Sequence, residues 1–222
     1  MTRGLLVLDL DGTLVLGDAP VEAYGREAVD ALPEQARGDA AARIAAFLAG
    51  DRDAVPGARD GYQAVARAAR AAGADRDDLE AAFHRSRAAR EGWLHAVRAP
   101  TGAVAVLGAL DGVRRVVATN SPSGVPALLE HVGLSTVVDD VIEGAGKPDG
   151  MPAVLDRFGV PGARIAGMGD IWINDLAEIA ARGGTTLLID RHGLSEGEPT
   201  VRGRVPEELL PAITEWAAAL PD

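Results

Sequence analysis

The residues of this chain that could do chemistry begin with two aspartates, Asp9 and Asp11, which lie one residue apart in the stretch DLDGTL. A short apolar run at 5–8 precedes them and a glycine follows, which predicts a buried strand that ends in a tight turn. Two carboxylates about 4 Å apart repel each other by ~1 kcal/mol in water and by about 4 kcal/mol at an effective dielectric constant of roughly 20. A fold accepts this repulsion most readily where a cation or a reaction uses both groups.

Simpler interpretations of the same stretch also exist. Aspartates after strands are common in capped turns, and the hexapeptide by itself leaves that interpretation open. A calcium-binding loop also begins Asp-x-Asp, but its sixth and twelfth positions would here be Leu14 and Pro20, where such a loop needs glycine and glutamate. The sequence therefore excludes the calcium loop.

A single lysine, Lys147, stands among 21 arginines. The two residue types are not interchangeable where a compact point charge is required, because the guanidinium group is planar and extended. Lys147 is therefore a candidate for a site that needs a small cation, with chance retention as the alternative.

Further polar side chains follow the later predicted strands of the chain. Thr119 and Asn120 follow the second strand, Lys147 follows the third, and Asp170 and Asp175 follow the fourth. Ligands of parallel sheets bind at the carboxyl ends of the strands. We therefore expect these side chains to lie together with the first pair of aspartates.

The elements that must position these groups alternate between strand and helix from about residue 100 onward. The alternation predicts an α/β fold with a mostly parallel sheet of about five strands, covered by helices on both faces. The strands are predicted at 5–8, 113–118, 137–142, 164–168 and 185–189, and the helices at 103–110, 126–132, 152–158, 174–182 and 206–220. The dipeptide Ser121-Pro122 predicts the start of the helix that follows the second strand, with the helix N-terminus beside Asn120 as an anion site.

Residues from about 18 to 98 have helical spacing and contain no convincing strand, which predicts a helical insertion after the first strand. Its helices are expected near 20–32, 39–49, 58–72 and 77–97. On the last of them Ser86 and Arg90 fall in the middle of an apolar stripe. Arg90 is a candidate for substrate binding, and a snorkelling side chain at the end of a bundle is the alternative.

Composition narrows the classes of function. The net charge of −11 and the absence of a basic stretch argue against nucleic-acid and membrane-surface partners. The chain has no cysteine, which excludes disulfides, thiolate catalysis and cysteine–zinc sites, and its four histidines have no metal-ligand spacing. Since no signal peptide or membrane span is evident, we expect a cytoplasmic protein.

Taken together in chain order, four motifs resemble the haloacid dehalogenase-like (HAD) hydrolase superfamily. They are DLDGTL at 9–14, VVATNSP at 116–122, GKPD at 146–149 and GDIWIND at 169–175. The resemblance implies a Rossmann-like three-layer αβα core formed by residues 1–16 and 99–222. It also implies that residues 17–98 form a C1-type helical cap, as in the subfamily I phosphatases.

The resemblance also implies catalytic roles. Asp9 would be the nucleophile that forms an aspartyl-phosphate, and Asp11 would protonate the leaving oxygen and later deprotonate the attacking water. Thr119 would donate a hydrogen bond to the transferring phosphoryl group, and Lys147 would neutralise that group and orient Asp9. The turn at Gly12 lets backbone N–H groups face the phosphate.

A metal site is the last implication. Asp9, the backbone carbonyl of Asp11, and Asp170 would bind Mg²⁺, and Asp175 would support the ion directly or through water. The chemistry of the residues agrees, because four carboxylates and one ammonium group are too negative to accept a phosphate dianion, and Mg²⁺ prefers oxygen ligands.

These features favour hydrolysis of a small phosphorylated metabolite by a monomer or homodimer. Asp11 argues against the dehalogenases of the superfamily, which lack this aspartate, and the absence of lysine from the insertion argues against members that cleave phosphonates through a Schiff base. A phosphomutase of the same superfamily and a non-catalytic protein that binds a phosphorylated ligand remain as alternatives.

Overall fold

The structure is a computed structural model that describes residues 2–193 and 195–221. It divides into two compact units. The first joins the segment that ends at Leu16 to the segment that begins at Arg98, and the second spans Gly17–Val97. Within the first unit Leu16 and Arg98 pair as an antiparallel bridge, with N–H···O distances of 2.8 and 3.0 Å.

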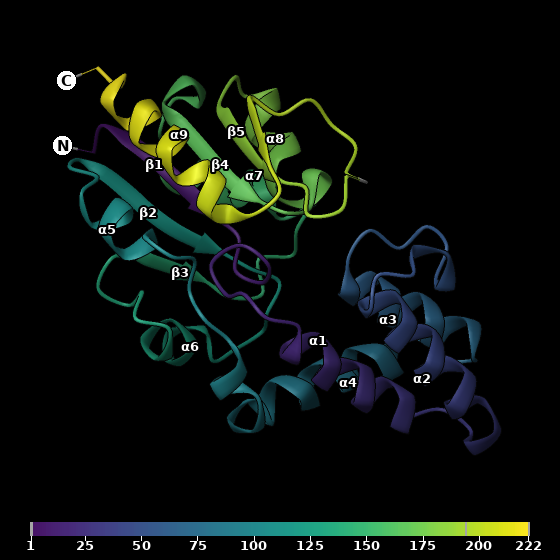
Figure 1. Cartoon of the computed structure of the whole chain (residues 1–222). Coiled ribbons are helices and arrows are strands. Elements are labelled where there is room, and N and C mark those ends of the chain that lie inside the picture. The colour runs from purple at the N-terminus through teal and green to yellow at the C-terminus, as the bar shows by residue number, and fades with distance from the viewer. Residues whose placement is uncertain (1, 194, 222) are drawn as a thin grey trace. The chain divides into compact units, whose positions relative to one another are not determined.

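The first unit is built on a six-stranded parallel sheet in the order β3-β2-β1-β4-β5-β6 (Figure 1). Helices lie on both faces of this sheet, so the predicted αβα architecture is confirmed. The strands are β1 (Gly4–Leu8), β2 (Val113–Ala118), β3 (Asp140–Ile142), β4 (Ile165–Gly169), β5 (Thr185–Ile189) and β6 (Val201–Gly203). The helices are α5 (Ala103–Gly108), α6 (Val125–His131), α7 (Met151–Asp156), α8 (Ala177–Ala181) and α9 (Pro206–Ala218), and a π-helical turn spans Trp172–Leu176.

Every residue of the central strand β1 is buried, as expected for a strand covered on both faces. Because side chains alternate along a strand, Leu5 and Val7 point to one face, where they join a core that α7 and α8 complete. Gly4 lies on the opposite face, where an added Cβ would lie 3.2 Å from Trp216 of α9. This packing fixes the carboxyl end of β1, from which the site extends.

The sheet differs from the prediction at its two edges. It has six strands and not five, because β6 adds to β5. This strand has only three residues and is held by contacts across a loop, in which Thr186 N donates to Thr200 Oγ1 and Asp190 N donates to Gly203 O. At the other edge β3 begins at Asp140, three residues later than predicted.

The second unit is a bundle of the helices α1 (Ala19–Asp30), α2 (Glu34–Leu48), α3 (Gly61–Ala71) and α4 (Arg76–Ala88), with 3₁₀ turns at Arg52–Ala54, Arg90–Gly92 and Leu94–Ala96. The side chains of Tyr24, Tyr62 and Phe83 pack with ring centroids 5.5–6.0 Å apart and join α1, α3 and α4. Asp60 and Asp75 cap α3 and α4 by accepting hydrogen bonds from Gln63 N and Asp78 N.

Helix α4 ends at Ala88, although the apolar pattern predicts a helix up to residue 97. The indole N–H of Trp93 donates to the carbonyl of Ser86 at 3.1 Å, so it satisfies one of the carbonyl groups that a helix end leaves without an intrahelical partner. Gly92, a poor helix former, lies in the turn that folds Trp93 back. The helix therefore ends, and two 3₁₀ turns follow, where the pattern suggested continuation.

None of the helices in the described parts of the chain is long and apolar enough to cross a membrane.

Candidate active site

The loop after β1 places Asp9 and Asp11 at the carboxyl end of the sheet. Asp9 N donates to Met168 O at 2.9 Å, which extends the pairing of β1 with β4 by one residue. Beyond it, the N–H groups of three successive residues from Thr13 to Val15 converge on the carbonyl of Leu10. The hydroxyl of Thr13 donates to Asp9 Oδ2 at 3.2 Å and fixes one face of that carboxylate.

Gly12 is required in this loop for two reasons. Its φ of +82° lies in the left-handed region, which side chains with a Cβ rarely adopt. A Cβ at this position would also lie 2.7 Å from Asp170 Oδ2. The missing side chain therefore lets the carboxylate that follows β4 approach the loop that follows β1.

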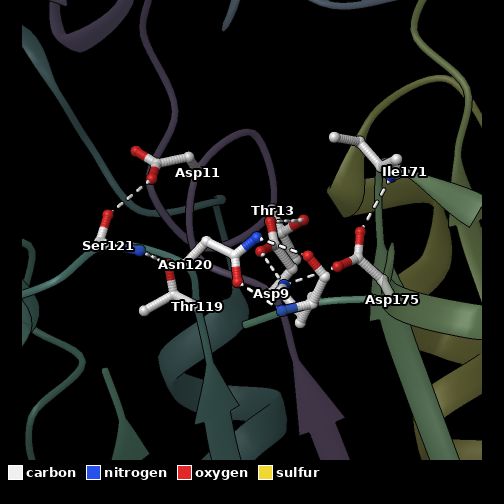
Figure 2. A network of polar contacts seen from close by, with 9 residues as sticks. Asp9, Asp11, Thr13, Thr119, Asn120, Ser121, Ile171 and Asp175 are labelled. Carbon is white, nitrogen blue, oxygen red and sulfur yellow. Dashed lines mark hydrogen bonds and ion pairs between the residues drawn. The ribbon is translucent and has the colours of Figure 1, made fainter. Parts of the chain in front are cut away.

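Lys147 joins two of the carboxylates. Its Nζ lies 2.7 Å from Asp9 Oδ1 and 2.6 Å from Asp175 Oδ1, and its side chain is 3 % exposed. Figure 2 shows the side chains of Asp9 and Asp175 directed toward each other, Asp9 from the residue after β1 and Asp175 from the turn after β4. One buried ammonium group thus ties two separate strand ends together.

Asp175 is held by the π-helical turn that follows β4. Its Oδ2 accepts a hydrogen bond from Ile171 N at 2.9 Å, and its own N–H donates to Ile171 O at the same distance (Figure 2). A Cβ on Gly169 would lie 2.5 Å from Asp175 Cβ, so this glycine leaves room for the aspartate against the strand. The side chain is buried and has little freedom to turn.

Asn120 forms a two-point contact with the backbone of Lys147. Its Oδ1 accepts from Lys147 N at 2.7 Å, and its Nδ2 donates to Lys147 O at 3.0 Å. The side-chain amide imitates a backbone pair and connects the loop after β2 to the loop after β3. The sequence suggested phosphate binding for Asn120, and the structure engages both ends of its amide with the chain itself.

Ser121 does not begin a helix as its place before proline suggested. Helix α6 starts at Val125 behind Gly124, so its N-terminus does not directly follow Asn120. The Ser121 hydroxyl donates instead to Asp11 Oδ2 at 3.3 Å, and Ser121 N donates to Thr119 Oγ1 at 3.0 Å (Figure 2). A long-range contact takes the place of the local cap.

Three carboxylates of the site are close enough to share one cation. Oxygen atoms of Asp9, Asp170 and Asp175 lie within 4.8 Å of one another. They come from the ends of β1 and β4, which are neighbours in the sheet. A set of carboxylate oxygens suits a hard divalent cation such as Mg²⁺ better than zinc.

Comparison with known proteins identifies the family. A model of haloacid dehalogenase-like hydrolases matches residues 4–183. The chain belongs to this family. It is therefore a hydrolase of the HAD type, and the resemblance drawn from the four motifs is confirmed. A search of curated proteins found no match.

Solved structures with the same fold include other HAD proteins. A HAD phosphatase from Thermococcus onnurineus is 17 % identical, with a TM-score of 0.60 over 95 % of this chain and 97 % of that one. A predicted phosphoglycolate phosphatase from Haemophilus somnus is 18 % identical, with a TM-score of 0.62 over 96 % and 99 %. The HAD hydrolase YfnB from Bacillus subtilis, solved with bound magnesium, is 20 % identical, with a TM-score of 0.58 over 95 % and 98 %. At these identities the likeness shows the fold alone.

Burial of charged groups in the HAD site shifts their pKa values. Burial raises the pKa of Asp9 from 3.8 to about 7, and although Lys147 opposes the shift, the carboxylates of Asp175 and Asp11 reinforce it. Burial also works against the charged form of Lys147, but the carboxylates of Asp9 and Asp175 outweigh it and raise the pKa of Lys147 above its ordinary value. The lysine therefore stays charged, and Asp9 is the group whose charge depends on its surroundings.

The structure gathers most of the predicted site residues of this HAD hydrolase at one end of the sheet. Hydrogen bonds or close carboxylate contacts link them from the loops after β1, β2, β3 and β4. The residues are Asp9, Asp11, Gly12, Thr119, Asn120, Lys147, Asp170 and Asp175. Thr13 and Ser121 also belong to this network, although the sequence did not predict the contact of either residue with an aspartate of the site. Spacing offered a signal only for Thr13, which follows Asp9 within the same turn.

The predicted stripe on the last helix of the second unit is confirmed for Leu79 and Ser86, which are buried on α4, but it does not extend along the helix to Arg90. Arg90 lies in a 3₁₀ turn beyond the end of α4. Ser86 is buried and its hydroxyl donates to the carbonyl of Phe83 in its own helix. The buried cation of this region is Arg87, which donates to Tyr62 Oη at 2.8 Å and lies against the rings of Phe83 and Trp93. A substrate contact by Arg90 stays a prediction.

Proposed function

We propose that the protein is a Mg²⁺-dependent phosphomonoester hydrolase that acts on a small phosphorylated metabolite through an aspartyl-phosphate. The observation that carries the proposal is the placement of the Lys147 ammonium group between Asp9 and Asp175, 2.7 and 2.6 Å from their oxygens, at the carboxyl end of β1 and β4. A carboxylate held beside a positive charge supports the proposal, because phosphoryl transfer depends on positioning and on stabilising negative charge.

Asp9 is the nucleophile in this proposal. Its oxygen forms a bond to phosphorus while the bond from phosphorus to the ester oxygen breaks, and Asp11 gives a proton to that departing oxygen. In the second step water attacks the aspartyl-phosphate and gives a proton to Asp11, which restores Asp9 and releases phosphate. Thr119 donates a hydrogen bond to the transferring group, and Lys147 offsets its negative charge.

The carboxylates fit a divalent cation, which the family fold also implies. Asp9 and Asp170 would hold Mg²⁺ together with the backbone carbonyl of Asp11. Asp175 would support the ion directly or through water, and its carboxylate is held in place by Lys147 and Ile171 N. A bound Mg²⁺ would supply positive charge for the phosphate oxygens.

The charge balance of the site supports this assignment. Four carboxylates and one ammonium group repel a phosphate dianion unless a cation is added. The same addition would favour the ionised, nucleophilic form of Asp9, whose pKa is otherwise about 7. We therefore expect activity only with a divalent cation.

The test is release of inorganic phosphate from p-nitrophenyl phosphate and from a panel of phosphorylated metabolites, with MgCl₂ and after treatment with EDTA. We expect turnover with Mg²⁺, its loss with EDTA, and its loss in Asp9→Asn. Absence of turnover across the panel, or full activity of Asp9→Asn, would contradict the proposal.

The same panel separates the two alternatives. A phosphomutase would convert one sugar phosphate into its isomer with little release of phosphate. A non-catalytic phospholigand-binding protein would be stabilised by a member of the panel without consuming it. The second unit would act in this scheme as a C1-type cap, and Arg90 as a substrate contact would be judged by the Michaelis constants of Arg90→Ala. A cytoplasmic location and a monomeric or homodimeric state stay predictions.

A further inference from the structure

Ser121 is a buried residue with a fixed orientation that the proposed reaction has not yet used. It is 2 % exposed and follows β2 by three residues. Its N–H donates to Thr119 Oγ1 at 3.0 Å, and its carbonyl accepts from Gly144 N at 2.9 Å. Two contacts on its own backbone thus determine where its side chain points.

The side chain points at Asp11. The Ser121 hydroxyl donates to Asp11 Oδ2 at 3.3 Å, across a separation of 110 residues. Figure 2 shows the Asp11 carboxylate turned toward Ser121, while the carboxylates of Asp9 and Asp175 lie together elsewhere in the network. The contact gives the second aspartate of the pair a side-chain partner different from Lys147 and Thr13, which contact Asp9.

We propose that Ser121 is a positioning residue that holds the Asp11 carboxyl group in the orientation needed for proton transfer. The inference rests on the proposed hydrolase function. In this role Oδ2 accepts the hydrogen bond from the serine hydroxyl and Oδ1 carries the exchanged proton. From there it passes to the ester oxygen as the bond to phosphorus breaks, and Oδ1 later accepts a proton from the attacking water.

This role predicts a dependence on the leaving group that a purely structural serine would not produce. An aliphatic alkoxide is a poor leaving group and needs a proton, whereas p-nitrophenolate is stable without one. A general acid commonly contributes a factor of about 10²–10⁴. Misplacing Asp11 should therefore slow the cleavage of an alkyl phosphate far more than that of p-nitrophenyl phosphate.

The experiment compares kcat/KM for p-nitrophenyl phosphate, phenyl phosphate and glycerol 2-phosphate with Mg²⁺, because kcat/KM reports the steps up to departure of the leaving group. Ser121→Ala should lose about tenfold on glycerol phosphate and less than about twofold on p-nitrophenyl phosphate, with phenyl phosphate between them. Ser121→Thr retains a hydroxyl and should recover most of the loss. Ser123→Ala removes an exposed serine two residues away and should match the wild type on all three esters.

A double-mutant cycle with Asp11→Asn tests the coupling directly. Once Asp11 cannot act as an acid, adding Ser121→Ala should have no further effect that depends on the leaving group. An equal loss on all three esters, or no loss on any, would overturn the inference while leaving the hydrolase function intact. Absence of wild-type turnover would overturn both, and thermal unfolding of each variant separates these outcomes from misfolding.

Discussion

At the scale of single residues, the site depends on groups whose size matters as much as their charge. The Lys147 ammonium group fits between two carboxylate oxygens with contacts of 2.7 and 2.6 Å. A guanidinium group is wider and directs its N–H groups in a fixed plane. A substitution that keeps the charge still changes the geometry.

Lys147→Arg should therefore be nearly inactive. We expect kcat for p-nitrophenyl phosphate to fall by about 10² or more, since a displaced cation no longer fixes Asp9 for attack. Steady-state kinetics with saturating MgCl₂ measure the effect. Arg26→Lys, the reverse exchange at an exposed position, serves as the control and should retain full activity. Wild-type rates in Lys147→Arg would contradict the need for a compact charge.

Gly12 allows a prediction that separates backbone strain from site geometry. In Gly12→Ala, a residue with a left-handed backbone conformation would carry a Cβ 2.7 Å from Asp170 Oδ2. The Asp170 side chain can turn away to relieve this contact. Gly133→Ala imposes the same strain at φ +78° with no atom within 4 Å.

Both variants should lose about 1 kcal/mol of stability. Only Gly12→Ala should also need about tenfold more Mg²⁺ for half-maximal activity, because it displaces a proposed ligand. Equal Mg²⁺ requirements in the two variants would mean that Asp170 does not hold the ion.

At the scale of elements, the end of α4 shows how a side-chain donor can satisfy a terminal carbonyl of a helix. The indole N–H of Trp93 satisfies the carbonyl of Ser86, whereas the indole N–H of Trp216 in α9 is buried without a hydrogen-bond partner among the described residues. The two tryptophans form a matched pair, because replacement by phenylalanine removes the same atoms from each.

Trp93→Phe should cost about 1 kcal/mol more than Trp216→Phe. The first substitution leaves a helix carbonyl without its donor, and the second removes a donor that already lacks an acceptor. Urea unfolding of both variants measures the difference. If the two variants were equally stable, the Trp93 hydrogen bond would not stabilise the end of α4.

Elements with a continuous local pattern could be predicted from the sequence, and elements held by distant contacts could not. The runs at 113–118 and 185–189, which are rich in β-branched residues, predicted β2 and β5 with the bounds that the structure has. Strand β6 has only three residues, which is too few for a recognisable sequence pattern. Ser121 was misjudged because its partner Asp11 lies 110 residues away.

The candidate site was predictable in its members and less so in its contacts. Chain order alone places polar groups at the carboxyl ends of parallel strands, which is why Asp9, Lys147 and Asp175 were expected together. Spacing carries no information about the rotation of a side chain. The two-point contact of Asn120 with the backbone of Lys147 therefore emerged only from the structure.

At the scale of the whole molecule, the buried charges link folding stability to pH and to the cation. The pKa of Asp9 is about 7 in the folded state and 3.8 in a model peptide. At a pH between these two pKa values, Asp9 is protonated in the folded state and ionised in the unfolded state. The stability that this group contributes is therefore fully present below about pH 3.8 and is lost as the pH rises through about 7.

Added Mg²⁺ would compete with that proton and replace the lost stability. We expect MgCl₂ to raise the melting temperature more at about pH 8 than at about pH 5. Scanning calorimetry of wild type and Asp9→Asn measures the effect, and the variant, which cannot titrate here, should show a small and pH-independent response. A larger effect of Mg²⁺ at the lower pH would contradict the assignment.

The bridge between Leu16 and Arg98 has a consequence for how such a chain could change over time. The 81 residues of Gly17–Val97 leave and rejoin the first unit at two paired residues whose N–H···O distances are 2.8 and 3.0 Å. A short turn could close the same gap, because the ends are already joined. The inserted bundle could in this sense be exchanged without breaking this pairing, and if it acts as the proposed cap, lineages that exchanged it could acquire new substrates while keeping the site residues of the first unit.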